Sequence, residues 1–258
     1  LIPVDTYGRG IISKDGEETY EFQTCQFVNK ENRTKFLIDE AEKLSNKYQT
    51  QKAKPIPVLP EIVTVEDVKY VLSSHYQGTP YDPYGAYGDK SMNGAYRSIG
   101  INRNDFMSLI QMRPEQPEDS RAIEWVAFAS NAFNVMAPFY ADIDETPEYF
   151  ANTTGEVSTE NFYWSSRMIA AMADASYKKS IFHIERYQEH VMAKAHQIIN
   201  RYDDDLTKES DIAKRMQIKR EANREIAKMV KKETSDTLSK VLYELSNQMK
   251  NSYARSDA

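Results

Sequence analysis

His75-Tyr-Gln-Gly-Thr-Pro-Tyr-Asp-Pro-Tyr-Gly85 places two glycines, two prolines and three tyrosines within eleven residues. Glycine and proline at this density interrupt helices and strands and favour tight turns. Five of the nine glycines of the chain lie between residues 78 and 100. We therefore expect an ordered loop of several turns here, and loops of this kind often carry functional side chains.

The residues before this loop predict a strand and two helices. Thr64-Val-Glu-Asp67 resembles a capping box with Asp in place of Glu, so we expect a helix that starts there and ends near His75. Further upstream, residues 19–28 alternate as in a strand, and residues 31–48 have apolar positions at helical spacing. Three prolines in residues 55–60 predict an extended connector between the two helices.

The residues after the loop predict a β-meander followed by a helical hairpin. The expected strands are Tyr96–Arg103, Phe106–Met112 and Ala122–Ser130. A long amphipathic helix is expected from Thr159 to about Tyr202, and a second helix from Ile212 to Met249 after a polar turn. The fold class is therefore α+β. We expect residues 1–155 to form the α+β portion and residues 156–258 to form the hairpin packed on it.

Composition restricts the class of protein. Forty per cent hydrophobic residues in 258 describe a globular chain, and a net charge of -6 argues against a nucleic-acid partner. The sequence contains no apolar run long enough to span a bilayer, and its first residues do not resemble a signal peptide, so we expect a cytoplasmic protein without a membrane partner. Because the chain starts with Leu1 instead of Met, we also expect that it has been trimmed at its start. A single cysteine, Cys25, excludes an internal disulfide, and no cofactor or metal is expected.

Four separated blocks in this order resemble the dipeptidase A type of bacterial cysteine dipeptidases: His75–Gly85, Tyr96–Arg103, Trp125–Phe128 with Ala137–Tyr140, and Tyr163–Arg167. The resemblance covers most of residues 60–175. It implies the fold of the N-terminal nucleophile hydrolases, a four-layer αββα sandwich, and hydrolysis of dipeptides with broad side-chain tolerance.

The catalytic cysteine of that family is the first residue of the mature chain, and its own α-amino group moves the proton. Here position 1 is Leu, and Cys25 lies in a predicted strand without a basic neighbour or helix end to activate it. We therefore expect Cys25 to be a structural thiol and the nucleophile to lie on a preceding amino-terminal segment. The 258 residues alone are expected to be inactive.

The resemblance also suggests which residues of this chain reach the reacting groups. Arg97, Arg103 and Asn102 are candidates for stabilising the thiolate or the oxyanion. Asp82 and His75 are candidates for binding substrate, Asp82 through the substrate ammonium. The alternatives are surface arginines, an Asx turn at Asp82, and a helix-capping role for His75.

The sequence leaves two other functions open. The helical hairpin offers an apolar seam, so a non-catalytic binding or assembly module is the main alternative, and a homo-oligomer is expected. A self-contained hydrolase that pairs Cys25 with a distant histidine lacks any activating context. His183 and His190 are seven residues apart, which is not the spacing of a metal-binding pair, and with His196 they are expected to be solvated or to lie at an interface.

Overall fold

The computed structural model describes residues 9–12, 18–21, 26–27, 63–85 and 89–250 of the chain. These belong to two compact units, Leu1–Val63 and Thr64–Ala258. In the first unit, the described residues form an antiparallel sheet in the order β1 (Arg9–Ile12), β2 (Glu18–Glu21) and β3 (Gln26–Phe27). Tyr20 pairs with Phe27, so the single strand predicted for residues 19–28 is wrong, because β2 and β3 are two strands that pair antiparallel. Cys25, the predicted helix 31–48 and the connector 55–60 lie outside the described residues.

The second unit begins with helix α2, Val65–Leu72. The side chain of Thr64 accepts a hydrogen bond from the Asp67 amide at 3.1 Å, and the Asp67 carboxylate accepts one from the Thr64 amide at 2.9 Å. The predicted capping box is therefore confirmed. The helix ends at Leu72 with Ser73 as its cap, which leaves His75 at the start of the glycine-rich loop.

A second antiparallel sheet has the order β4 (Phe106–Met112), β5 (Ala122–Phe128) and β6 (Ala137–Tyr140). The meander is confirmed for its two longer strands, but the strand predicted at Tyr96–Arg103 is wrong. The Gly100 amide donates to the Ser74 carbonyl at 2.8 Å, and a Cβ at Gly100 would lie 2.4 Å from the Ser73 carbonyl oxygen. This segment is therefore held against the end of α2 instead of pairing with β4.

The two faces of this sheet differ in burial. Ile123, Trp125 and Ala127 alternate along β5 and are fully buried, which gives the sheet one core face. On the opposite face of β4, Ile110 and Met112 are 65% and 60% exposed. The outer edge of β6 is closed by an amide side chain: the Tyr140 amide donates to Asn223 Oδ1 at 2.9 Å, and Asn223 Nδ2 donates to the Tyr140 carbonyl at 3.2 Å.

The helical part contains α3 (Glu148–Ala151), α4 (Phe162–Ala175), α5 (Tyr177–Lys208) and α6 (Ile212–Ser246). The continuous helix predicted from Thr159 to Tyr202 is wrong at one point, because α4 and α5 are separated at Ser176. The Ser176 hydroxyl donates to the Met172 carbonyl one turn earlier at 2.8 Å, a bond that bends helices.

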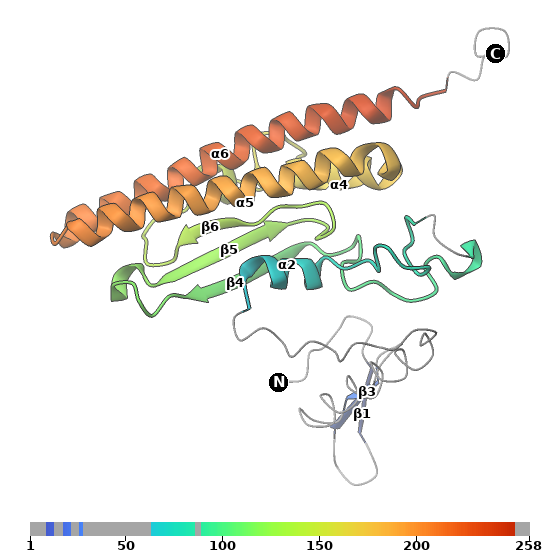
Figure 1. Cartoon of the computed structure of the whole chain (residues 1–258), viewed down its shortest axis with the longest axis horizontal. Coiled ribbons are helices and arrows are strands. Elements are labelled where there is room, and N and C mark those ends of the chain that lie inside the picture. The colour runs from blue at the N-terminus through green and yellow to red at the C-terminus, as the bar shows by residue number, and fades with distance from the viewer. Residues whose placement is uncertain (1–8, 13–17, 22–25, 28–62, 86–88, 251–258) are drawn as a thin grey trace, which may run out of the picture. The chain divides into compact units, whose positions relative to one another are not determined.

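Helices α5 and α6 form the expected hairpin and run side by side over the sheet (Figure 1). The turn lies at residues 209–211, later than predicted, and Asp211 caps α6 by accepting from the amides of Ala213 and Lys214. The fold is therefore α+β, as predicted. The division at residue 155 stays a prediction. No helix within the described residues is long and apolar enough to cross a membrane.

Candidate functional site

The loop after α2 is folded so that His75 faces Asp82. Two consecutive tight turns need unusual backbone angles, with φ of 65° at Tyr76 and 75° at Gly78. The Thr79 hydroxyl closes the first turn by donating to the Tyr76 carbonyl at 2.7 Å. Asp82 closes the next one as an Asx turn, because its Oδ1 accepts from the Tyr84 amide at 2.9 Å.

His75 and Asp82 form a buried pair. Their side chains meet at 3.0 Å between Nδ1 and Oδ1, and the residues are only 8% and 4% exposed. A carboxylate only accepts hydrogen bonds, so Nδ1 carries the hydrogen and Nε2 of the neutral ring is left as an acceptor. The nearest described partner of Nε2 is the Tyr177 hydroxyl at 3.5 Å, which is long for a hydrogen bond.

Two stacked tyrosines enclose this pair. The rings of Tyr84 and Tyr177 lie 4.2 Å apart and nearly parallel, and both present themselves to the His75 ring edge-on, at 5.3 and 5.8 Å. Burial raises the pKa of Tyr177 to about 12, and it also raises the pKa of Tyr84, whose hydroxyl donates to Asp174. Both phenols are therefore neutral at physiological pH.

His75 and Tyr177 line a cavity of about 490 Å³ that extends between α2 and α5. Its walls include apolar side chains from α5 and from residues 132–136, together with several charged groups. The complete lining comprises Glu66, Lys69, Tyr70, Ser73, His75, Gln77, Ala132, Val135, Met136, Tyr177, Ile181, Glu185, Gln188, Glu189 and Met192.

Lys69 fixes the position of α2 beside the cavity. Its Nζ donates to Ser73 Oγ at 2.9 Å, to the Asn131 carbonyl at 2.5 Å and to Asn134 Oδ1 at 2.6 Å. Burial lowers the pKa of Lys69 to about 7, while three acceptor oxygens match the three hydrogens of the ammonium form. We therefore regard Lys69 as a charged tether between α2 and the Asn131–Asn134 segment.

The other three predicted residues do not line the cavity. Arg97, Asn102 and Arg103 are exposed in the irregular segment between Gly94 and β4. The backbone of Arg97 is fixed to the loop, since its carbonyl accepts from the Tyr76 hydroxyl at 3.1 Å. His75 and Asp82 are thus brought together, and the roles of all five candidates stay predictions.

Sequence reasoning missed the contribution of the helices to this site. Tyr177 lies 102 residues after His75, and only its position at the start of α5 brings it to the loop. Lys69, Glu185 and Glu189 have no motif around them that would have indicated a cavity. The tyrosines of the loop were the one sequence feature that indicated a site, and they did not indicate which residues elsewhere in the chain contact the loop.

The remaining histidines pair with carboxylates on neighbouring helices. His183 Nε2 lies 3.5 Å from Glu244, His190 Nδ1 lies 4.0 Å from Glu233, and His196 Nε2 lies 2.6 Å from Glu66. Across the described ranges, no three His, Cys, Asp or Glu side chains are grouped so that they could hold a metal ion.

A second cluster of charges joins the β4–β5 connection to the helical hairpin. Arg113 forms two hydrogen bonds to the Asp203 carboxylate, at 2.5 and 3.1 Å, and the Tyr140 hydroxyl donates to the same carboxylate at 2.8 Å. All three residues are buried. Such an arrangement is a cross-link between the sheet and α5, because each charge has an opposite charge in contact.

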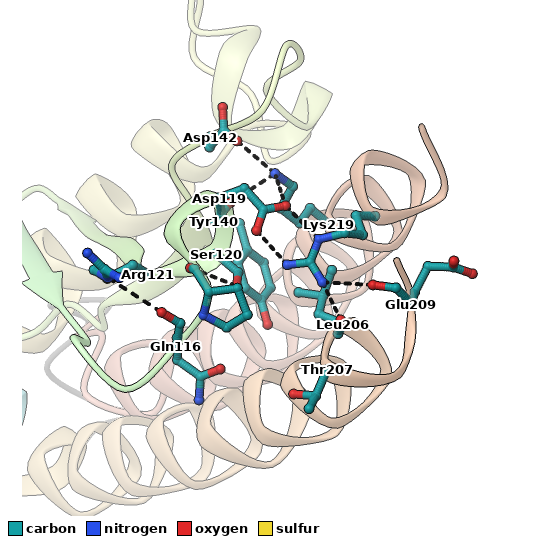
Figure 2. Close-up of polar contacts among 12 residues, drawn as sticks. Gln116, Asp119, Ser120, Arg121, Tyr140, Asp142, Leu206, Thr207, Glu209 and Lys219 are labelled. Carbon is teal, nitrogen blue, oxygen red and sulfur yellow. Dashed lines mark hydrogen bonds and ion pairs between the residues drawn. The ribbon is translucent and has the colours of Figure 1, made fainter. Parts of the chain in front are cut away.

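The same connection is also attached to α6. Arg215 donates to both carboxylate oxygens of Asp119, at 2.8 and 2.5 Å. Figure 2 shows Lys219 between Asp119 and Asp142, and its Nζ donates at 2.9 Å both to the Asp119 carbonyl and to the Asp142 carboxylate. This cluster is balanced in charge, so we assign it to the stability of the fold.

Comparison with known proteins identifies relatives that are named dipeptidases. The model of peptidase family C69 matches residues 19–190, a range that contains the His75–Asp82 pair and every lining residue of the cavity except Met192. A dipeptidase of Bifidobacterium longum is 39% identical over 232 residues, covering 76% of this chain and 44% of that protein. A probable dipeptidase A of Streptococcus pyogenes is 42% identical over 195 residues, covering 76% of this chain and 40% of that protein. A probable dipeptidase B of Lactococcus lactis is 36% identical over 181 residues, covering 70% and 37%. The chain therefore spans less than half the length of these curated relatives.

Proposed function

Because the chain belongs to peptidase family C69, we propose that it is the carboxyl-terminal part of a cysteine-type dipeptidase. The observation that carries the proposal is the match to proteins named dipeptidase over 76% of the chain, at 39% and 42% identity. The substrate is a dipeptide, and the reaction is hydrolysis of its peptide bond.

The proposed mechanism uses a cysteine thiolate supplied by an amino-terminal segment of the same protein. The sulfur attacks the peptide carbonyl, and the oxyanion that forms must be stabilised. The leaving amine takes a proton from the α-amino group of the cysteine, and water then hydrolyses the thioester. Cys25 is the single cysteine of this chain, and no proton acceptor was predicted beside it.

Arg97, Asn102 and Arg103 supply the positive charge and the hydrogen-bond donors in this proposal. Their exposure supports it, since an exposed side chain can approach a nucleophile carried by another segment. The buried His75–Asp82 pair forms part of the substrate site, and its 3.0 Å contact keeps the imidazole in one orientation.

We also propose that the complete protein has the αββα sandwich of the N-terminal nucleophile hydrolases. The open face of the β4–β5–β6 sheet supports this, because Phe106, Ile110 and Met112 are more than half exposed there. In a sandwich, a second sheet would cover these side chains while α5 covers the opposite face.

The direct test is dipeptide hydrolysis by the 258-residue chain, with and without a separately expressed amino-terminal segment that begins at its cysteine. We expect hydrolysis only after mixing, as followed by mass spectrometry of the released amino acids. Arg97→Ala should then lower kcat by about 10²- to 10³-fold, as expected for a group that stabilises the oxyanion. Arg186→Ala is the control, since Arg186 lies over the Phe182 ring on α5. Hydrolysis by the isolated chain would contradict the proposed origin of the nucleophile.

A non-catalytic assembly module is the second candidate. It is favoured by exposed apolar side chains on the hairpin, Phe182 on α5 and Leu242 and Tyr243 on α6. Substitution of Leu242 and Tyr243 by serine should abolish self-association if this candidate is right, and should leave hydrolysis by the mixed segments unchanged if the dipeptidase proposal is right.

A further inference from the structure

The cavity beside His75 has the size and the apolar wall of a site for a small organic ligand. Its volume of about 490 Å³ lies within the usual range for such sites. Val135 and Met136 are fully buried beneath it, and Ile181 and Met192 of α5 are half-buried against the same core. An apolar side chain of a ligand would therefore exchange water for contacts with Ile181 and Met192, which keep part of their surface open to the cavity.

The charged groups of the lining differ in whether they are already paired. Lys69 donates to three oxygens of the protein, and Glu66 accepts from His196 at 2.6 Å. Glu185 and Glu189 line the same cavity, and neither carboxylate forms a hydrogen bond or an ion pair with another described residue. They lie one turn apart on α5, where like charges repel each other, so a cation between them would be stabilised.

His75 adds an independent polar group to the wall. It is 8% exposed, and the only described contact of its Nε2 is the 3.5 Å approach of the Tyr177 hydroxyl. A buried acceptor with so long a contact gains from a donor on a ligand, because a buried polar group without a good hydrogen bond is costly. Asp82 cannot be that donor, since it already faces Nδ1.

We propose that this cavity binds a short peptide that has a free α-ammonium group and an apolar first side chain. The ammonium lies at Glu185 and Glu189, the side chain lies against Ile181 and Met192, and a peptide N–H donates to His75 Nε2. The proposal deepens the proposed function and rests on it, because a dipeptidase acts on peptides with a free amino end. The proposal assigns recognition of the free amino end of the peptide to the two carboxylates of α5.

The test measures binding without turnover, by isothermal titration of the 258-residue chain with Leu-Gly and with N-acetyl-Leu-Gly. We expect Leu-Gly to bind at least about tenfold more tightly, a factor that corresponds to about 1.4 kcal/mol. The double variant Glu185→Gln/Glu189→Gln should lose this preference. Asp204→Asn/Asp205→Asn is the matched control, because it removes two exposed carboxylates of α5 that do not line the cavity.

Methyl-labelled methionines locate the bound peptide. The resonances of Met136 and Met192, which line the cavity, should shift on addition of Leu-Gly, whereas the resonance of Met249, which is 81% exposed, should not. Unchanged melting temperatures of both double variants confirm that they are folded, as expected for exposed positions.

Three results would overturn the proposal: no binding of Leu-Gly at millimolar concentration, equal binding of the acetylated peptide, or unchanged binding by the Gln variant. These results are distinguishable from failure of the proposed function. Binding with the expected preference but no hydrolysis after mixing would refute the dipeptidase mechanism alone, and hydrolysis without that preference would refute the peptide site alone.

Discussion

Asp82 accepts two hydrogen bonds through one oxygen, and this double role decides the effect of replacing it. Its Oδ1 accepts from His75 Nδ1 at 3.0 Å and from the Tyr84 amide at 2.9 Å. Asp82→Ala leaves both donors without a partner. We expect the free energy of unfolding to fall by about 2 kcal/mol, since each buried unsatisfied donor costs about 1–3 kcal/mol. Asp82→Asn keeps an oxygen for these donors and should cost less.

Urea unfolding of the two variants tests this expectation. Asp105→Ala is the control, because Asp105 pairs with Arg167 at 2.9 Å on the exposed surface, where an ion pair contributes less than about 1 kcal/mol. Equal losses for Asp82→Ala and Asp105→Ala would show that the His75–Asp82 pair does not hold the loop.

Asp119 contributes to the loss of folding stability at acid pH. The hydrogen bonds from Arg215 lower the pKa of its carboxyl group, and the charges of Arg215 and Lys219 add to this effect. The folded-state pKa lies below the unfolded value of about 3.9, so the contribution is complete above that pH and is lost as the pH falls through the folded value. We expect Asp119→Asn to reduce the loss of stability between neutral and acid pH.

The control for Asp119 is Asp144, an exposed residue whose pKa is lowered by a hydrogen bond from Arg220. Water screens that pair more strongly, so Asp144→Asn should alter the pH dependence less. Thermal melts from pH 7 to pH 3 measure both. The same pH dependence in the two variants would rule out a special role for the Asp119 cluster.

At the scale of elements, the sequence predicted features that depend on neighbouring residues. The predictions were wrong where contacts beyond the local pattern determine the course of the chain. The capping box at Thr64 and the alternation in β5 depend on neighbours within a few residues, and both could be predicted from the sequence. Tyr96–Arg103 has strand-like residues, yet the contact of Gly100 with α2 determines its course. Ser176 likewise breaks a regular apolar pattern through a hydroxyl that bonds to its own helix.

Gly100 is therefore the test of how this segment is placed. A methyl group there would lie 2.4 Å from the Ser73 carbonyl oxygen, and backbone atoms cannot move aside without shifting α2 or the segment itself. We expect Gly100→Ala to lower the free energy of unfolding by about 1–3 kcal/mol, as overpacking does in other proteins. Gly155→Ala meets nothing within 4 Å and should change it by less than about 0.5 kcal/mol. Equal stability of the two variants, measured in urea, would mean that Gly100 is not closely packed.

At the scale of the whole molecule, the candidate site and the cross-link between the sheet and α5 both combine groups that are distant in sequence. His75 and Tyr177 are 102 residues apart, and Arg113 and Asp203 are 90 residues apart. The loop could be selected from its glycines, prolines and tyrosines, but its partners could not, because nothing local in α5 indicates which face meets the loop. The four segments that resemble the dipeptidase family indicated where candidate site residues lie in the sequence. Tertiary packing determines which of these residues meet.

The open face of the second sheet predicts how the 258-residue chain behaves alone. Ile110 and Met112 are 65% and 60% exposed, and the edge of β4 that does not pair with β5 adjoins them. Apolar faces and unpaired edges of this kind favour association between copies. We expect light scattering to give a mass above that of the monomer, rising with concentration.

Replacing both residues by lysine, as Ile110→Lys/Met112→Lys, should give a monomer, because charges on an exposed sheet face oppose pairing between copies. The melting temperature should change little, since neither side chain belongs to the buried core. Val157→Lys is the control: Val157 is 63% exposed but lies outside the sheet, so its replacement should leave association unchanged. A monomeric parent chain would refute the expected association, and loss of association in the Val157 variant would place the contact elsewhere.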